Sequence, residues 1–104
     1  MDELVTALNA TELKFAHFGW SKAPKGDYGV YAEDGANDLV AGNVHSERVV
    51  EGTIDYFTRD ASMAAKATIE AALNGVPVAW RLNSIQFEND TGYIHLEWVF
   101  QVQG

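Results

Sequence analysis

The sequence predicts an α+β fold, with an antiparallel β-sheet of about four or five strands and two helices packed on one face of it. Two segments carry apolar residues at helical spacing, and the longer one ends at a glycine that a proline soon follows. Several other segments alternate apolar and polar residues with the period of two that a half-buried strand shows. A chain of 104 residues has room for one such core, so residues 1–104 are expected to form a single domain.

The first half of the chain predicts one helix and two strands, followed by a loop. Residues 2–9 predict a short amphipathic helix, because acidic residues open the segment and its leucines fall on one side. Residues 12–20 predict a strand that ends at a stretch with Pro and Gly, and residues 27–33 predict a second short strand. Residues 34–43, DGANDLVAGN, are rich in Gly, Asp and Asn and predict an exposed loop without regular structure.

The second half predicts a long strand, the clearest helix and a hairpin. Residues 47–57 alternate as a third strand with one face toward solvent. The segment RDASMAAKATIEAALNGVP predicts a helix with Asp60 as its N-cap and Gly75 at its end. Residues 79–88 predict a fourth strand, in which the apolar positions change face, so a bulge or bend is expected near Asn83.

The last predicted strand follows the turn ENDTG and alternates most strictly of all. Its even positions are apolar and predict a face toward the core: Ile94, Leu96, Trp98, Phe100 and Val102. Its odd positions form a mixed face of the sort that subunit interfaces use: Tyr93, His95, Glu97, Val99 and Gln101.

The charge of the chain weighs against binding to a phosphate backbone. There are 15 Asp and Glu residues against 7 Lys and Arg, which gives a formal net charge of −8, whereas such binding needs clustered Lys and Arg. No stretch approaches the roughly 18 apolar residues of a membrane-spanning helix. The acidic N-terminal segment lacks the features of a signal peptide, and the chain has no cysteine, so a protein made and used in a cytoplasm is expected.

Residues for catalysis, cofactors or metals do not fall into a known pattern. His17, His45 and His95 lie in three separate segments without metal-ligand spacing. Residues 34–43 lack the spacing of a calcium loop, and phosphate-binding and nucleophile motifs are absent from the sequence. We therefore expect no catalytic, cofactor or metal site, although His95 and Glu97 share a strand face and are the candidates if a site exists.

Two segments carry a resemblance to a known family. EGTIDYFTRD is a strand that runs into a helix start, and FENDTGYIHLEWVF is an acidic turn before an aromatic-rich strand. With the short N-terminal helix these features span nearly the whole chain, which resembles the tail terminator proteins of long-tailed bacteriophages, the lambda tail terminator family. Similar small proteins are encoded near the head–tail junction in phages and prophages of Gram-positive bacteria. The chain is shorter than the lambda protein and matches it poorly over residues 34–43.

The resemblance implies a non-enzymatic virion structural protein that forms a ring, usually a hexamer, which ends the tail tube and joins the tail to the head. The implied partners are other copies of the chain, the major tail protein and a head-completion or connector protein, while DNA passes through without specific binding. The implied location is the head–tail junction of the virion, after assembly in the cytoplasm of the host bacterium. The interface is expected on the mixed face and the glycine-rich loop: Tyr93, His95, Glu97, Val99, Gln101, Asp34, Asn37 and Asp38.

Three alternatives stay open from the sequence. A head-completion or connector protein at the same joint would share these features. A small acidic ligand-binding domain would use the face that carries His95 and Glu97. An acidic inhibitor that mimics DNA would use the negative charge itself. The gene neighbours separate these classes, since a tail terminator gene is expected just before a major tail protein gene.

Overall fold

The computed structural model describes residues 1–37 and 49–103 of the chain. In these residues the helices and strands follow one another as α1 (Asp2–Ala10), β1 (Phe15–His17), β2 (Tyr28–Asn37), β3 (Val49–Thr58), α2 (Ala64–Asn74), β4 (Ala79–Phe87) and β5 (Ile94–Gln103). The strands form one sheet in the order β1-β2-β3-β5-β4, so the predicted α+β fold is confirmed. In the described part of the chain, none of the helices has the length and apolar character needed to cross a membrane.

The sheet is mixed, because β1 pairs with β2 in parallel while the other three pairings are antiparallel. The predicted antiparallel arrangement is confirmed for these three pairings, and the parallel edge strand β1 is the exception to it. A parallel neighbour requires the chain to cross back before the second strand begins, and residues 18–27 make this return. Phe18 and Gly19, with φ angles of 67° and 147°, turn the chain out of β1. For this reason the strand predicted over residues 12–20 is reduced to three residues.

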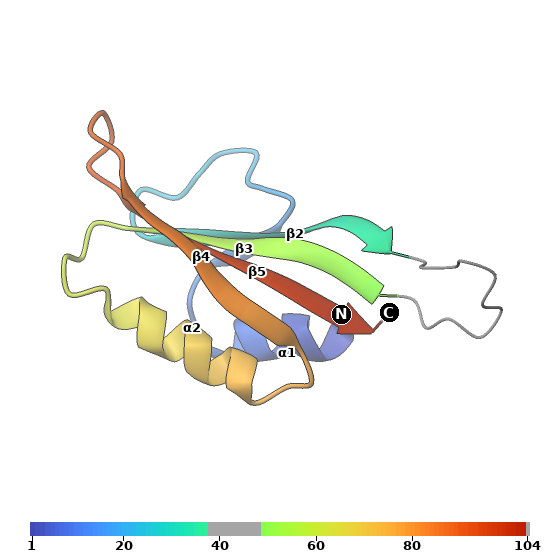
Figure 1. The fold of residues 1–104 in the computed structure, drawn as a ribbon. Coiled ribbons are helices and arrows are strands. Elements are labelled where there is room, and N and C mark those ends of the chain that lie inside the picture. The colour runs from blue at the N-terminus through green and yellow to red at the C-terminus, as the bar shows by residue number, and fades with distance from the viewer. Residues whose placement is uncertain (38–48, 104) are drawn as a thin grey trace, which may run out of the picture.

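Both helices lie on the same side of the sheet, where they cover its core face (Figure 1). The core joins apolar side chains of the two helices to alternate residues of three strands: Leu4, Leu8, Ile69, Leu73, Tyr31, Ile54, Tyr56, Leu96, Trp98 and Phe100. The predicted core face of β5 is confirmed at its three central positions, and the two positions at the ends are half-buried. Trp98 is completely buried, and its indole Nε1 donates a hydrogen bond to Glu70 Oε2 at 3.0 Å, which ties β5 to α2.

The start of α2 differs from the prediction. The N-cap residue is Met63, in the left-handed region at φ 52°, and it makes no capping hydrogen bond with its side chain. Asp60, the predicted N-cap, lies one turn earlier, where its carboxylate accepts a hydrogen bond from the backbone N–H of Ser62 at 3.0 Å. The N-cap is the residue directly before the first helical residue. Asp60 does not occupy that position, because the turn that it stabilises lies between Asp60 and the start of α2. The end of the helix at Gly75 is as predicted.

Part of the predicted loop over residues 34–43 belongs to a strand. β2 continues to Asn37, and its pairing with β3 shifts between Glu33 and Gly35, which leaves Asp34 as the extra residue of a bulge. The Gly, Asp and Asn residues of positions 34–37 favour turns, but the pairing of β2 with the long strand β3 outweighs that local preference. Residues 38–43 of the predicted loop, and the first two residues of the predicted third strand, lie outside the described residues.

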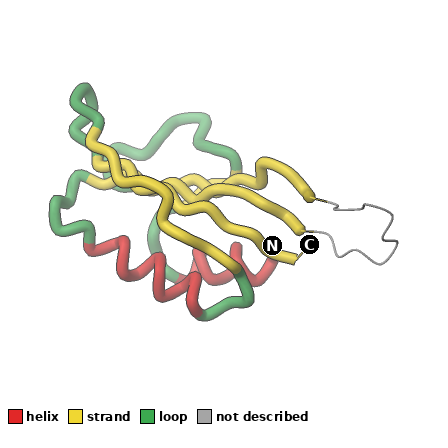
Figure 2. The backbone as a smooth tube through the Cα atoms, in the orientation of Figure 1, coloured by secondary structure: helices red, strands yellow, loops and turns green. Residues whose placement is uncertain are grey.

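The predicted bend in the fourth strand is confirmed. The pairing of β4 with β5 shifts at Asn83, so the side chains of Ile85 and Phe87 beyond it point to the same side of the sheet as Leu96. Figure 2 shows the tip of the β4–β5 hairpin lying away from both helices, at the end of the molecule opposite the two termini. Side chains near this tip that point to the core side of the sheet are therefore not covered by a helix.

Candidate assembly surface

The side of the sheet that faces away from the helices is called the outer face here. Neither α1 nor α2 covers it (Figure 1). It is formed by the residues that alternate with the buried ones on β3 and β5, together with their neighbour on β4: Glu51, Thr53, Asp55, Phe57, His95, Glu97, Val99, Gln101 and Arg81. The structure thus brings four of the predicted interface residues together on one face, while their role in an interface stays a prediction.

Three carboxylates of the outer face are held in place by hydrogen bonds. Asp55 and Glu97 lie directly opposite each other on β3 and β5, a like-charge arrangement that destabilises a sheet unless it is compensated. Asn83 Nδ2 donates to Glu97 Oε1 at 2.6 Å, and Gln101 Nε2 donates to Glu51 Oε1 at 2.8 Å. These bonds fix the carboxylates as hydrogen-bond acceptors on an ordered acidic surface.

His95 interacts with the third carboxylate, that of Asp55, and connects β5 with β3 and with the hairpin turn. Its Nε2 lies 2.7 Å from Asp55 Oδ1, and its Nδ1 lies 3.8 Å from Glu88 Oε2 in the hairpin turn. Its ring stacks on Phe57 with 4.3 Å between the centroids. The hydrogen bond with Asp55 raises the pKa of the His95 imidazole above its ordinary value, although partial burial acts in the opposite direction. Among the residues described, no three His, Cys, Asp or Glu side chains are grouped so that they could hold a metal ion.

A shallow hollow of about 460 Å³ lies at one end of the outer face. Its lining includes Asp34 of the β2 bulge together with Glu51, Arg81, Val99 and Gln101. Asp34 was predicted to share an interface with the odd residues of β5, and the structure places it beside two of them. The guanidinium of Arg81 donates a hydrogen bond to Asn83 Oδ1 at 2.9 Å, so this cation is part of the same polar network.

The remaining predicted interface residues do not join this surface in the same way. Asn37 ends β2, and Asp38 lies outside the described residues. Tyr93 lies directly before β5, and only 7% of the residue is exposed. Its hydroxyl donates a hydrogen bond to the carbonyl oxygen of Gly26 at 2.9 Å, and the guanidinium of Arg59 lies 3.9 Å from its ring centre. Tyr93 thus fastens the hairpin to the loop before β2.

Arg81 and Asn83 were missed by the sequence reasoning. The alternation in β4 changes face near Asn83, so the pattern alone does not say which of its polar residues share a side with Glu97. The pairing of β4 with β5, which joins Arg81 to Val99, supplies that information. The sequence did indicate the β3 part of this surface, because Glu51 and Asp55 occupy odd-numbered positions of the third predicted strand, on the face opposite its apolar residues.

Large apolar side chains are also exposed away from the outer face. Phe18 follows β1 and is 67% exposed, and Ile85 and Phe87 near the tip of the hairpin are 45% and 63% exposed. Isolated apolar residues on a surface are common, but two on one strand, two residues apart, form a small patch.

No family model and no curated protein matches this chain. The functional proposal therefore rests on the sequence resemblance and on the surfaces described above.

Proposed function

We propose that this protein is a non-enzymatic virion structural protein that assembles as a ring at the end of a phage tail tube. There it stops the growth of the tube and provides the surface that joins the tail to the head. Its partners are other copies of this chain, the major tail protein and a head-completion or connector protein. It acts by self-assembly and contact at the head–tail junction of the virion.

The observation that supports this function is the outer face, a polar sheet surface that neither helix covers. It carries the carboxyl groups of Glu51, Asp55 and Glu97 and the guanidinium of Arg81. If this face lines the bore of a ring, it repels the phosphates of DNA, because tight binding requires that clustered Lys and Arg neutralise them. DNA can then slide through the ring, and the net charge of −8 acts in the same direction.

The experiment uses tail tubes assembled from the major tail protein, whose gene is expected directly after the gene of this chain. Tubes grown in the presence of the protein are expected to be uniform in length and to carry a ring at one end in electron micrographs. Glu97→Lys is expected to abolish uniform capping, because it places a cation on the outer face and removes the acceptor of Asn83.

Glu12→Lys is the matched control. It makes the same change of charge on an exposed residue in the turn after α1, which is not part of the outer face, and is expected to cap tubes as the wild type does. Tubes of uncontrolled length with bare ends in the presence of wild-type protein would reject the tail terminator role. Binding to heads and not to tubes would assign the chain to the connector position instead.

A further inference from the structure

Ile85 and Phe87 form an exposed apolar patch, called the hairpin patch. The register shift at Asn83 turns both side chains toward the core side of the sheet. At this end of β4 that side is not covered by α1 or α2, because the hairpin tip lies away from both helices (Figure 2). The two side chains therefore continue the core layer into solvent, where their exposure costs free energy that a partner surface would recover.

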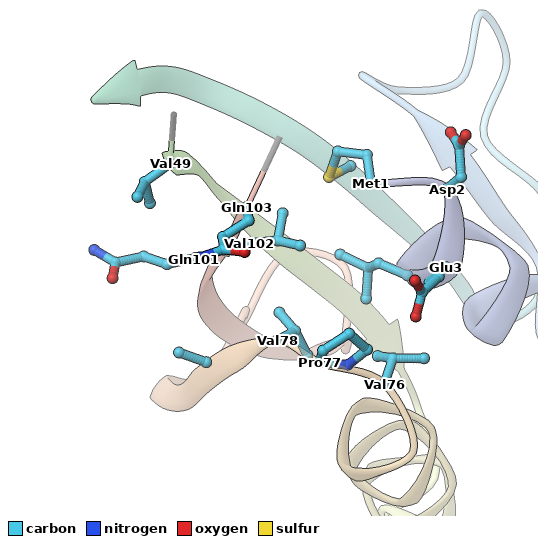
Figure 3. A pocket seen from close by; sticks show the side chains of 12 residues that line it. Met1, Asp2, Glu3, Val49, Val76, Pro77, Val78, Gln101, Val102 and Gln103 are labelled. Atoms are coloured by element: carbon cyan, nitrogen blue, oxygen red, sulfur yellow. The ribbon is translucent and has the colours of Figure 1, made fainter. Parts of the chain in front are cut away.

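An apolar groove of about 790 Å³ opens at the other end of the same layer, and it is called the end groove. Figure 3 shows Val102 of β5 between Met1 on one side and Val76 to Val78 on the other. The valines and Met1 are half-buried, so they line a recess and do not close it. Asp2 and Glu3 also line the groove and are exposed, which gives the apolar recess an acidic rim.

The two surfaces lie at opposite ends of β4. Ala79, its first residue, lines the end groove, and Phe87, its last residue, belongs to the hairpin patch. Nine residues of strand span roughly 30 Å at about 3.3 Å per residue. A chain therefore cannot place its own hairpin patch in its own end groove, but the hairpin of a second copy can reach it.

We infer that the hairpin patch of one copy docks into the end groove of the next copy, so that the chain assembles head to tail. The two surfaces differ from each other, and contacts between unlike surfaces are heterologous: they close into a ring when the rotation per copy allows it, and otherwise form an open row. This inference deepens the proposed function and rests on it for the closure into a ring.

The area of the contact says how strong one such joint is. A whole aromatic side chain buries about 150–250 Å², and Phe87 and Ile85 are only 63% and 45% exposed, whereas a stable interface buries about 800 Å² per partner. The two side chains supply well under half of that area, so an isolated pair of copies is weak. In a closed ring every copy makes two joints, and the second forms at a high effective concentration.

Charge makes the joint weaker at low salt. The hairpin turn carries Glu88 and Asp90, and the groove carries Asp2 and Glu3, so carboxylates approach carboxylates when the surfaces meet. Salt screens this repulsion within about 10 Å at 0.1 M. Association is therefore expected to increase with both protein concentration and salt, the opposite of the behaviour of a joint held by ion pairs.

The test is sedimentation velocity of four proteins over a range of concentrations at high salt. The wild type is expected to form species larger than a monomer. Phe87→Glu removes the hairpin patch and Val78→Asp spoils the groove, so each is expected to stay monomeric. Phe18→Glu makes the same chemical change at an exposed phenylalanine elsewhere and is expected to associate as the wild type does.

An equal mixture of the Phe87→Glu and Val78→Asp proteins gives the sharpest result. Each variant keeps one good surface, so at the highest concentrations the mixture is expected to form dimers that grow no further, a result specific to head-to-tail contacts. Melting curves check that both variants fold, and Pro77→Glu, at an exposed residue of the groove, replaces Val78→Asp if that variant is unfolded.

The outcomes separate this inference from the proposed function. A strictly monomeric wild type at every concentration, or a Phe87→Glu protein that associates normally, overturns the head-to-tail joint. If Phe87→Glu still forms rings on tail tubes, the tail role stands and the joint is wrong. If the mixture gives dimers while the wild type neither binds nor caps tubes, the joint stands and the tail role is wrong.

Discussion

Trp98 and Gln101 lie three positions apart on β5, yet they contribute in different ways. Trp98 is completely buried and donates to Glu70, so Trp98→Ala removes a large ring from the core and is expected to lower the free energy of unfolding by about 3–5 kcal/mol. Gln101 is exposed, so Gln101→Lys is expected to change the free energy of unfolding by less than about 1 kcal/mol. Urea denaturation followed by fluorescence measures both. If Gln101→Lys unfolds the protein while Trp98→Ala is tolerated, the assignment of the two faces of β5 is reversed.

His95 makes the stability depend on pH. Its pKa is raised in the folded chain, mainly by the hydrogen bond with Asp55, so the folded state binds the proton more tightly than the unfolded state does. This contribution is complete below the unfolded-state pKa of about 6.5 and is lost as the pH rises through the folded-state value. The melting temperature of the wild type is therefore expected to fall above about pH 6.5, and that of His95→Gln to change less over the same range. Equal losses in both proteins would assign the pH dependence to other groups.

At the scale of elements, Gly52 controls how closely β2 and β3 approach. A Cβ atom at this position would overlap the carbonyl oxygen of Ala32 and the ring of Phe100. The carbonyl belongs to the backbone of β2 and cannot move aside without breaking the pairing. Gly52→Ala is expected to cost about 1–3 kcal/mol, as overpacking of a core usually does, and a melting curve measures it. An unchanged melting temperature would mean that the strands can separate without penalty.

The accuracy of prediction from the sequence also differs between elements. The core face of β5 and the bend at Asn83 were predictable, because alternation reports which side of a strand is buried. The parallel pairing of β1 was not, since a connection of ten residues over 18–27 does not reveal which way the chain returns. The start of α2 was misplaced because Asp60 has the same preference for the turn before a helix as for the N-cap itself.

At the scale of the whole molecule, half of the candidate site could be predicted. The odd residues of β5 are local in sequence, so His95, Glu97, Val99 and Gln101 were placed on one face from the pattern alone. Their neighbours on β3 and β4 depend on the order of strands in the sheet, which is set by long-range packing. The hairpin patch and end groove were also beyond the pattern, because both depend on where the helices stop covering the sheet.

The strand order also bears on when the chain can fold during synthesis. β5 lies between β3 and β4, so β4 emerges from the ribosome before the strand it pairs with, β5, has been made. Until β5 has been translated and released from the exit tunnel, the two helices have half a sheet to cover and Trp98 is missing from its centre. A nascent chain arrested before Tyr93 is therefore expected to stay open to proteases. Any surface that needs the complete sheet is therefore expected to form only after β5 has been translated.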